Sequence, residues 1–260
     1  MNCKFFIKII LVMTNFLFFG CTKSCNSDRN STLIVGTNAN LPPFEFVGIN
    51  GEVEGFDIDV ANNLGKMLNK KVIIKEFDFD ALILALQKGQ IDVIISAMSI
   101  TPSRQKEIDM IPYQGDIIKE IAFITKEQLS SNDFNELKSL SKQKNLPISV
   151  QAGHFLENFL ISLNIPLILL AGPPEQLLDV KYQKSLAAAL DPINADELIR
   201  NHPELFITKI SLPTEYWNYG NGIGISKSNK QLQQDITKAL EDLRNNGTIN
   251  SLELKWFKGK

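Results

Sequence analysis

Residues 91–108 read IDVIISAMSITPSRQKEI and indicate the fold of this chain. The apolar run 93–95 predicts a buried strand that ends in the hydroxyl side chains of Ser96 and Ser99. Thr101 and Pro102 then form the N-cap and the first position of a helix that carries Arg104. A helix N-terminus beside a fixed guanidinium is a receptor for a carboxylate. The alternative is a capped surface helix with a solvated arginine.

Composition indicates a folded chain without the charge pattern of a nucleic-acid-binding protein. The 260 residues are 44% hydrophobic and 22% charged, and the net charge of −2 leaves no basic patch for nucleic acid. The two histidines and three cysteines lack metal-ligand spacing, so no metal site is expected. GxSxG, HExxH, P-loop and dinucleotide-binding motifs are missing as well, so the sequence predicts neither an enzyme nor a cofactor.

The N-terminus has the pattern of an export signal. Lys4 and Lys8 precede the apolar run 9–19, whose 11 residues are too few to span a bilayer as a helix. Gly20 before Cys21 predicts a lipoprotein signal: residues 1–20 are removed, Cys21 is lipidated, and residues 21–31 form a polar tether. The two phenylalanines at 18–19 depart from the usual pattern, and plain secretion is the alternative. No cysteine follows residue 25, so the folded body has no disulfide.

After the tether, short apolar runs alternate with amphipathic segments. Alternation of strands and helices predicts an α/β fold with mainly parallel sheets. The pair Asp191 and Pro192 also has the pattern of an N-cap and first helical residue, ahead of a helix at 193–199. We expect strands at 33–35, 72–74, 93–95, 148–150 and 186–190, and helices at 56–68 and 232–243.

Two breaks in this alternation, at 112–116 and 212–215, suggest where the chain divides. If both are crossings between the same two lobes, residues 32–117 and 220–260 form a discontinuous first lobe and residues 118–219 form a second lobe. Ligand pockets favour the cleft between such lobes. The alternative is that both breaks are ordinary loops.

Several separated segments stand in the order and spacing of one protein family. They are GTNANLPPFEF at 36–46, GFDID at 55–59, FDALI at 79–83, the 91–108 stretch, and LRNNGT at 243–248 followed by Trp256. Over about residues 32–257 the chain resembles the polar amino-acid-binding proteins of ABC importers, and within them the arginine-binding lipoproteins. The resemblance implies a two-lobed type II periplasmic-binding-protein fold, with two mixed or parallel sheets flanked by helices and a hinged interlobe cleft.

The resemblance also implies how the cleft binds a free amino acid. Arg104 would hold the α-carboxylate together with Ser99 and nearby N–H groups, and Asp191 would hold the α-ammonium. Phe79 would be an aromatic wall, although by itself it also fits a buried helix face. The expected ligand-binding residues are Asn38, Leu41, Glu45, Phe79, Ser96, Ala97, Met98, Ser99, Arg104, Gly153, His154, Phe155 and Asp191.

Departures from the family pattern leave the side-chain specificity open. Lysine- and arginine-type members often carry an acid in place of Asn38 and an aromatic in place of Leu41, so a charge and a stacking face are missing. Glu45 is the remaining nearby acid, with a solvated loop position as its alternative. His154 replaces a small hydroxyl residue and is either a ligand contact or a surface residue. Ala97 stands where Gly or Ser is usual, at little expected cost.

The function implied is that of an extracytoplasmic solute-binding protein of an amino-acid ABC importer. It would bind arginine first, then glutamine, histidine or lysine, and deliver the ligand to the membrane subunits of a permease. We expect a monomer in the periplasm or cell envelope, held to the membrane only by its lipid. Two alternatives remain: an enzyme on the same fold, such as a cyclohexadienyl or prephenate-type dehydratase, and a sensor or adhesin that has lost transport.

Overall fold

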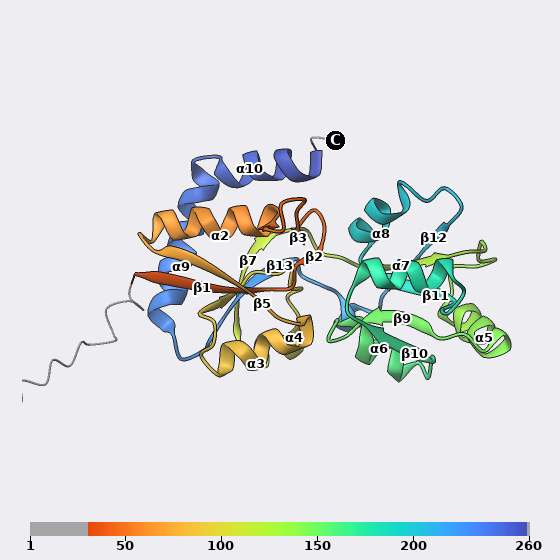
Figure 1. Cartoon of the computed structure of the whole chain (residues 1–260). Coiled ribbons are helices and arrows are strands. Elements are labelled where there is room, and N and C mark those ends of the chain that lie inside the picture. The colour runs from red at the N-terminus through yellow and green to blue at the C-terminus, as the bar shows by residue number, and fades with distance from the viewer. Residues whose placement is uncertain (1–30, 259–260) are drawn as a thin grey trace, which may run out of the picture.

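The computed structural model of this chain describes residues 31–258, which fold into two lobes lying end to end (Figure 1). Both lobes are α/β units in which helices flank a mixed sheet, so the predicted fold class is confirmed. The predicted signal peptide, Cys21 and the tether up to residue 30 lie outside the described residues. Among residues 31–258, no helix is long and apolar enough to cross a membrane.

The first lobe is built on a five-stranded sheet with the order β5-β1-β6-β13-β7. β1 pairs in parallel with β5 and β6, whereas β13 runs antiparallel to β6 and β7. Its strands are β1 (Thr32–Thr37), β5 (Lys71–Glu76), β6 (Val93–Ile94), β7 (Asp109–Gln114) and β13 (Asn221–Ile225). Its helices are α2 (Phe56–Met67), α3 (Leu82–Gln87), α4 (Pro102–Glu107), α9 (Lys230–Asn245) and α10 (Thr248–Glu253), with short turns at Phe79–Ala81 and Leu254–Lys258.

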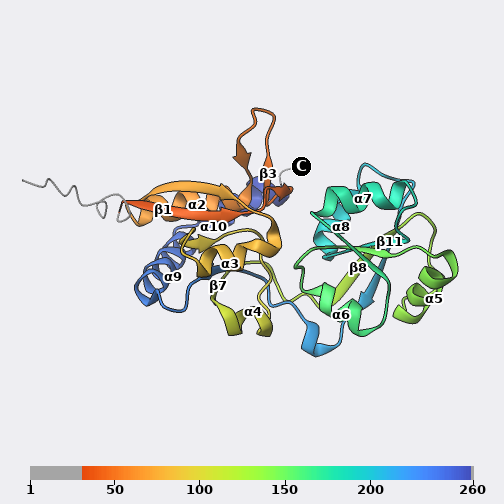
Figure 2. The ribbon, with the colours of Figure 1, turned by 60° about the horizontal axis from the view of Figure 1, so that its bottom comes forward.

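A small antiparallel sheet extends the first lobe. It consists of β2 (Asn40–Leu41), β3 (Glu45–Val47) and β4 (Val53–Glu54), in that order. Figure 2 shows the β3–β4 hairpin projecting from the lobe. The inner end of this sheet carries Leu41 and Glu45, which lie opposite each other in the pairing of β2 with β3.

The second lobe is built on a sheet with the order β10-β9-β11-β8-β12. β9 is parallel to β10 and β11, and β8 is antiparallel to β11 and β12. The strands are β8 (Glu120–Thr125), β9 (Ile148–Gln151), β10 (Leu167–Leu170), β11 (Ala187–Leu190) and β12 (Phe206–Ser211). The helices are α5 (Phe134–Lys144), α6 (Leu156–Ser162), α7 (Pro173–Lys181) and α8 (Pro192–Ile199), with a short turn at Thr214–Tyr216.

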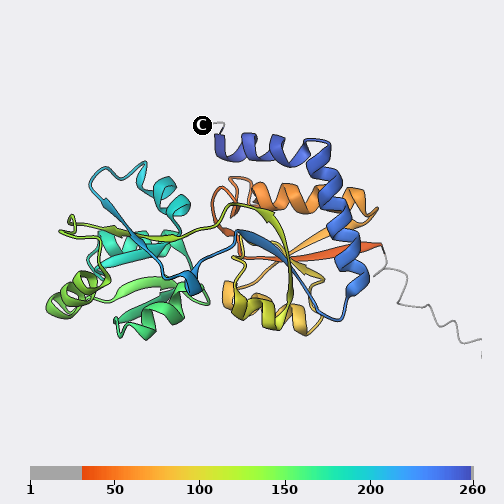
Figure 3. The ribbon, with the colours of Figure 1, turned by 180° about the vertical axis from the view of Figure 1, so that it is seen from behind.

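Two segments connect the lobes, and Figure 3 shows both running between the two sheets. β7 leads into β8, and β12 returns to β13. An isolated antiparallel bridge between Ile118 and Asn218 joins the two crossings. The predicted lobe boundaries, at 117/118 and 219/220, stay a prediction.

Each lobe has its own apolar core. In the first, α2 buries Phe56, Val60 and Leu64 completely, as the 3.6-residue period predicts. Met67 was expected on the same face but is exposed, since it is the last residue of the helix. The five expected strands are present, and they place their following loops at the boundary between the lobes.

Candidate functional site

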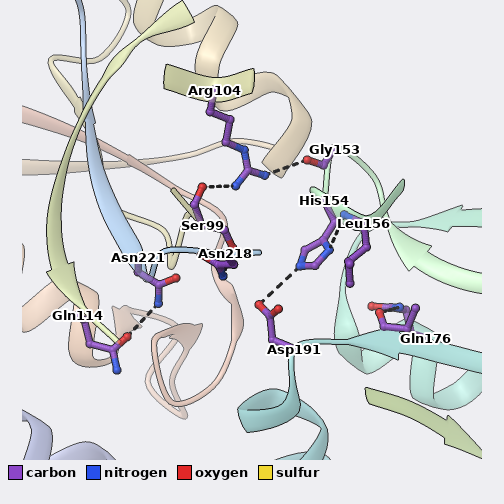
Figure 4. A network of polar contacts seen from close by, with 11 residues as sticks. Ser99, Arg104, Gln114, Gly153, His154, Leu156, Gln176, Asp191, Asn218 and Asn221 are labelled. Carbon is purple, nitrogen blue, oxygen red and sulfur yellow. Dashed lines mark hydrogen bonds and ion pairs between the residues drawn. The ribbon is translucent and has the colours of Figure 1, made fainter. Parts of the chain in front are cut away.

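Arg104 is held in place by the local sequence. Thr101 caps α4 by accepting a hydrogen bond from Arg104 N at 3.3 Å, and Pro102 takes the first position, so the predicted cap is confirmed. Nη1 of Arg104 donates to Ser99 O at 2.7 Å, and Nη2 reaches the second lobe to donate to Gly153 O at 3.0 Å (Figure 4). The alternative of a solvated arginine is wrong, because this side chain is only 7% exposed.

Asp191 acts on Arg104 from the second lobe without pairing with it. Burial lowers the pKa of Arg104 to about 10, and the charge of Asp191 opposes that shift. No ion pair joins these two described side chains; instead Asp191 Oδ2 lies 3.6 Å from His154 Nε2 (Figure 4). Arg104 and Asp191 therefore present a buried positive charge and a buried negative charge that are not paired with each other. Such an arrangement can bind the carboxylate and the ammonium group of a zwitterion.

Asp191 has the local pattern of an N-cap, and the structure separates that position from the capping contact. Asp191 does occupy the N-cap position, but its side chain makes no capping hydrogen bond. One of its carboxylate oxygens, Oδ1, is buried without a hydrogen-bond partner among the described residues. The carboxylate is therefore available to a ligand.

A small pocket of about 20 Å³ lies between the lobes. This volume holds about one water molecule, so the lobes must move apart to admit an amino acid. The pocket adjoins a larger cleft of about 1260 Å³, which the crossing segments and α10 help to line. The first lobe lines the small pocket with Asn40, Leu41, Glu45, Phe79, Ala97 and Ser99, and the second with Gln151, His154, Pro173, Gln176, Ala189, Leu190, Asp191 and Asn194.

The pocket is rich in unpaired acceptor oxygens. Nδ2 of Asn40 donates to Ala171 O at 2.9 Å, which turns Oδ1 of the same amide away from that carbonyl. Nε2 of Gln176 donates in the same way to Ser149 O and Ala189 O. Buried polar atoms are normally paired, so this pocket favours a ligand with many N–H donors. The lining residues with a buried side-chain oxygen and no partner in the described part of the chain are Asn40, Glu45, Gln176, Asp191 and Asn194.

More than half of the residues that the sequence proposes for the site lie at the pocket. Arg104 and Gly153 meet at the boundary of the lobes through their hydrogen bond. The ring centroid of Phe79 lies 5.2 Å from the guanidinium carbon of Arg104. The aromatic ring that was expected to contact the ligand therefore also contacts Arg104. His154 lines the pocket with its side chain 12% exposed, and the surface alternative is wrong. The proposed residues that line the pocket are Leu41, Glu45, Phe79, Ala97, Ser99, His154 and Asp191.

Six proposed residues do not line the pocket: Arg104 and Gly153, which meet at the boundary of the lobes, and four others. Ser96 and Met98 are buried on either side of Ala97, Met98 against the apolar core beneath it. Asn38 donates to Phe77 O and accepts from the other lobe, and Phe155 packs against the core of the second lobe. Met98 and Phe155 support the pocket from the apolar cores, whereas Asn38 joins the two lobes through Gln151.

Sequence reasoning also missed lining residues. Asn40 and Gln151 lie within segments that the sequence singles out, so their polar side chains were the available signal. The others come from α7, β11 and α8, whose approach to the first lobe depends on the folding of the whole second lobe. The missed residues are Asn40, Gln151, Pro173, Gln176, Ala189, Leu190 and Asn194.

Glu45 belongs to a buried acid pair beside the pocket. It is 1% exposed and Asp57 is fully buried, so the solvated loop position is wrong for Glu45. Asp57 accepts hydrogen bonds from Tyr113 Oη at 2.7 and 2.8 Å and from Ala97 N at 2.7 Å. Burial, and then the charge of Asp57, raise the pKa of Glu45 well above its usual range, whereas burial raises the pKa of Asp57 to about 6. Asp57 accepts three hydrogen bonds and Glu45 only one, so the carboxylate charge of the pair is better stabilised on Asp57 and the proton is held by Glu45.

Ala97 has a backbone conformation that corrects the expectation of little cost. Its φ of 41° lies in the left-handed region, which costs a residue with a Cβ atom about 1–2 kcal/mol. The hydrogen bond from Ala97 N to the buried Asp57 carboxylate holds this conformation. Asp57 thereby fixes the backbone at the pocket floor.

We expect the ligand-free protein to lose stability as the pH rises above about 5, because the pKa values of Asp57 and Glu45 are raised in the folded chain. A carboxyl whose pKa is higher in the folded chain stabilises fully below its unfolded pKa, and this contribution is lost as the pH rises through the folded pKa. The loss extends to about pH 6 for Asp57 and further for Glu45. Urea unfolding at about pH 5 and at about pH 8 measures this loss. The free energy of unfolding should fall by up to about 1.4 kcal/mol per pH unit for each proton.

The variant Glu45→Gln is the control for this pH dependence. Its side chain cannot ionise, so the slope should become smaller above about pH 6. Glu136 and Glu204, whose pKa values hydrogen bonds lower, stay ionised across this range and leave the slope unchanged. An unchanged slope in Glu45→Gln would show that Glu45 is ionised already in the wild-type protein.

Comparison with known proteins identifies the family. The profile described as bacterial extracellular solute-binding proteins, family 3, matches residues 33–259. The chain belongs to this family. By this membership the chain is an extracellular or periplasmic solute-binding protein, and the relatives reported below are binding proteins rather than enzymes. Among the described residues, no group of three or more His, Cys, Asp or Glu side chains is placed to hold a metal ion.

Three relatives illustrate the similarity. A probable ABC transporter arginine-binding protein, ArtJ of Chlamydia trachomatis serovar D, is 38% identical over 97% of this chain and 96% of its own. A Salmonella typhimurium periplasmic binding protein with high arginine specificity has a TM-score of 0.77 and 26% identity, over 87% of this chain and 99% of its own. An ancestral arginine-binding protein, 31% identical over 87% of this chain and 98% of its own, has TM-scores of 0.76 with bound arginine and 0.75 with bound glutamine.

Proposed function

We propose that this protein binds arginine between its lobes as the ligand-binding component of an amino-acid ABC importer. The arginine-binding relatives support this proposal. The observation that carries it is the set of unpaired acceptor oxygens in the pocket. Arginine presents an α-ammonium group and a guanidinium group, which consist of N–H donors and complement such a set. The α-carboxylate is the only acidic group of this ligand, and it would face the buried side chain of Arg104.

The proposed contacts follow from the hydrogen-bond donors and acceptors that these side chains do not use within the protein. Arg104 uses two of its five N–H donors on carbonyl oxygens, which leaves donors for the α-carboxylate of the ligand. The unpaired Oδ1 of Asp191 accepts from the α-ammonium. Oε2 of Glu45 accepts from the guanidinium, with Phe79 and Leu41 as its apolar neighbours.

Glutamine is the second candidate ligand, because the ancestral relative has been solved with either amino acid. Its side-chain amide has two N–H donors, whereas a guanidinium has five. Glutamine would therefore leave more of the acceptor oxygens unpaired and should bind more weakly. Histidine and lysine follow, because neither side chain ends in a planar group that carries an N–H2 fork.

The setting of this function is also a proposal. We propose that Cys21 carries a lipid and that residues 21–31 tether the body to the membrane. The protein would act as a monomer, since its lobes have to open and close freely, and would present its closed form to the permease.

Thermal unfolding of residues 26–260 with each of the twenty amino acids tests the proposal. Ligand at a hundredfold excess over its dissociation constant stabilises by about 2.7 kcal/mol. For a chain of this size, that corresponds to a rise in Tm of roughly 5–10 °C. We expect the largest rise with arginine and a smaller one with glutamine. No rise with any amino acid, from a sample that unfolds cooperatively, would contradict the proposed function.

A further inference from the structure

We propose that Glu45 releases a proton when a cationic ligand enters the pocket and keeps it when a neutral amide ligand enters. The protonation state of this one carboxyl would then select between arginine and glutamine. The inference rests on the proposed function and adds to it the control of specificity.

The geometry leaves one carboxyl oxygen of the acid pair free. Both oxygens of Asp57 are occupied by Tyr113 and Ala97. Oε1 of Glu45 accepts from Ser96 Oγ at 3.2 Å, no donor among the described residues reaches Oε2, and a side-chain hydrogen bond between Glu45 and Asp57 carries the proton of the pair. Ser96 Oγ itself accepts from a backbone N–H at 3.0 Å, which directs its own proton to Glu45. Glu45 thus lines the pocket with the only unsatisfied oxygen of the pair.

The charged surroundings of Glu45 explain why it carries the proton without ligand. Asp57 from α2 and Tyr113 from β7 face it within the lobe, and His154 and Asp191 line the same pocket from the second lobe. Arg104 does not line this small pocket: its guanidinium is held at Ser99 O and Gly153 O, and no cation of the described chain is among the groups that act on Glu45. Two neighbouring buried carboxyls with no cation beside them cannot both ionise cheaply.

A bound guanidinium changes this balance. Burying a cation without a counter-charge is strongly unfavourable. Asp191 is engaged by the α-ammonium and Asp57 by its own donors, so Glu45 is the acid left to face the guanidinium. Its O–H bond breaks, the electron pair stays on the carboxylate, and the proton passes to solvent. With glutamine, the proton stays on the Glu45–Asp57 pair, because a neutral amide brings no positive charge into the pocket.

Proton release makes the two affinities respond differently to pH. Arginine affinity should rise by up to tenfold per pH unit as long as the ligand-free protein holds the proton, and level off at higher pH. Glutamine affinity should stay constant over the same range and fall at higher pH. The ratio of the two affinities therefore increases with pH.

Titration calorimetry of the wild-type protein between about pH 5 and about pH 8 tests this inference. Pairs of buffers with different ionisation enthalpies give the number of protons released for each ligand. We expect close to one proton for arginine in the lower part of the range and none for glutamine. Arginine binding without proton release overturns the inference and leaves the proposed function standing, whereas failure of both ligands to bind overturns both.

Two variants separate Glu45 from other titrating groups. Glu45→Gln should abolish the proton release, lower the arginine affinity at least tenfold near pH 8, and retain glutamine binding. Glu54→Gln removes an exposed acid of β4 and should behave as wild type. Proton release that persists in Glu45→Gln overturns the inference, because another group would then be its source.

Discussion

Replacing Arg104 with alanine is expected to lower the affinity for arginine at least about thirtyfold. Truncating one partner of a buried, hydrogen-bonded charge pair costs about 2–5 kcal/mol, and 1.4 kcal/mol corresponds to a factor of ten. The ligand carboxylate would lose its bidentate donor in a pocket whose other free side-chain groups are acceptors. Titration calorimetry with arginine and with glutamine measures the effect, which should be similar for both because they share the same carboxylate.

Arg200→Ala provides the matched control. Arg200 at the end of α8 pairs with Glu197 in a mainly exposed ion pair, so its loss removes the same charge without touching the cleft. Arg104→Lys keeps the charge and loses the planar fork, and should recover only part of the affinity. Binding by Arg104→Ala within tenfold of wild type, from a cooperatively folded sample, would mean that the carboxylate is held elsewhere.

The position of Arg104 could be predicted because every determinant is local. A strand, a cap and a proline follow one another within the 91–108 stretch, and together they set the direction of one short helix. Asp191 illustrates the opposite case. Its local sequence favours a cap, and only the approach of α8 to the first lobe shows that the carboxylate faces His154 and Arg104 instead.

Glu45 shows a second limit of local reasoning. Glu45 stands shortly after two prolines, where the chain turns and a charged side chain is typically solvated. It is buried because β3 brings it against Asp57 of α2 and Ser96, which lies 51 residues further along the chain. Side-chain partners at such separations cannot be inferred from periodicity, although the family resemblance does place Glu45 near the ligand.

Replacing Gly153 with alanine is expected to weaken ligand binding about tenfold or more through the closure of the lobes. Gly153 belongs to the second lobe, and a Cβ atom there would lie 2.8 Å from Cβ and 2.9 Å from Cα of Asp80 in the first lobe. The obstruction is backbone, which cannot swing aside as the end of a long side chain would. Each 1.4 kcal/mol that disfavours the closed form lowers the affinity tenfold, because ligand is held between closed lobes.

Gly89→Ala separates this effect from backbone strain. Gly89 has a φ of 67° and Gly153 a φ of 74°, so a Cβ atom costs both positions a similar 1–2 kcal/mol or so of stability. Nothing lies within 4 Å of the added atom at Gly89, however. Both variants should therefore unfold at similarly reduced urea concentrations, and only Gly153→Ala should bind arginine more weakly.

Small-angle scattering then shows whether closure is the step that fails. Wild type and Gly89→Ala should become more compact when saturated with arginine, and Gly153→Ala should stay more extended at equal saturation. The hydrogen bond from Arg104 to Gly153 O joins the lobes at the same contact. A variant whose lobes are held apart therefore also loses this charge-assisted hydrogen bond. Wild-type affinity and compaction in Gly153→Ala would show that the loaded lobes do not approach as closely as the pocket of about 20 Å³ requires.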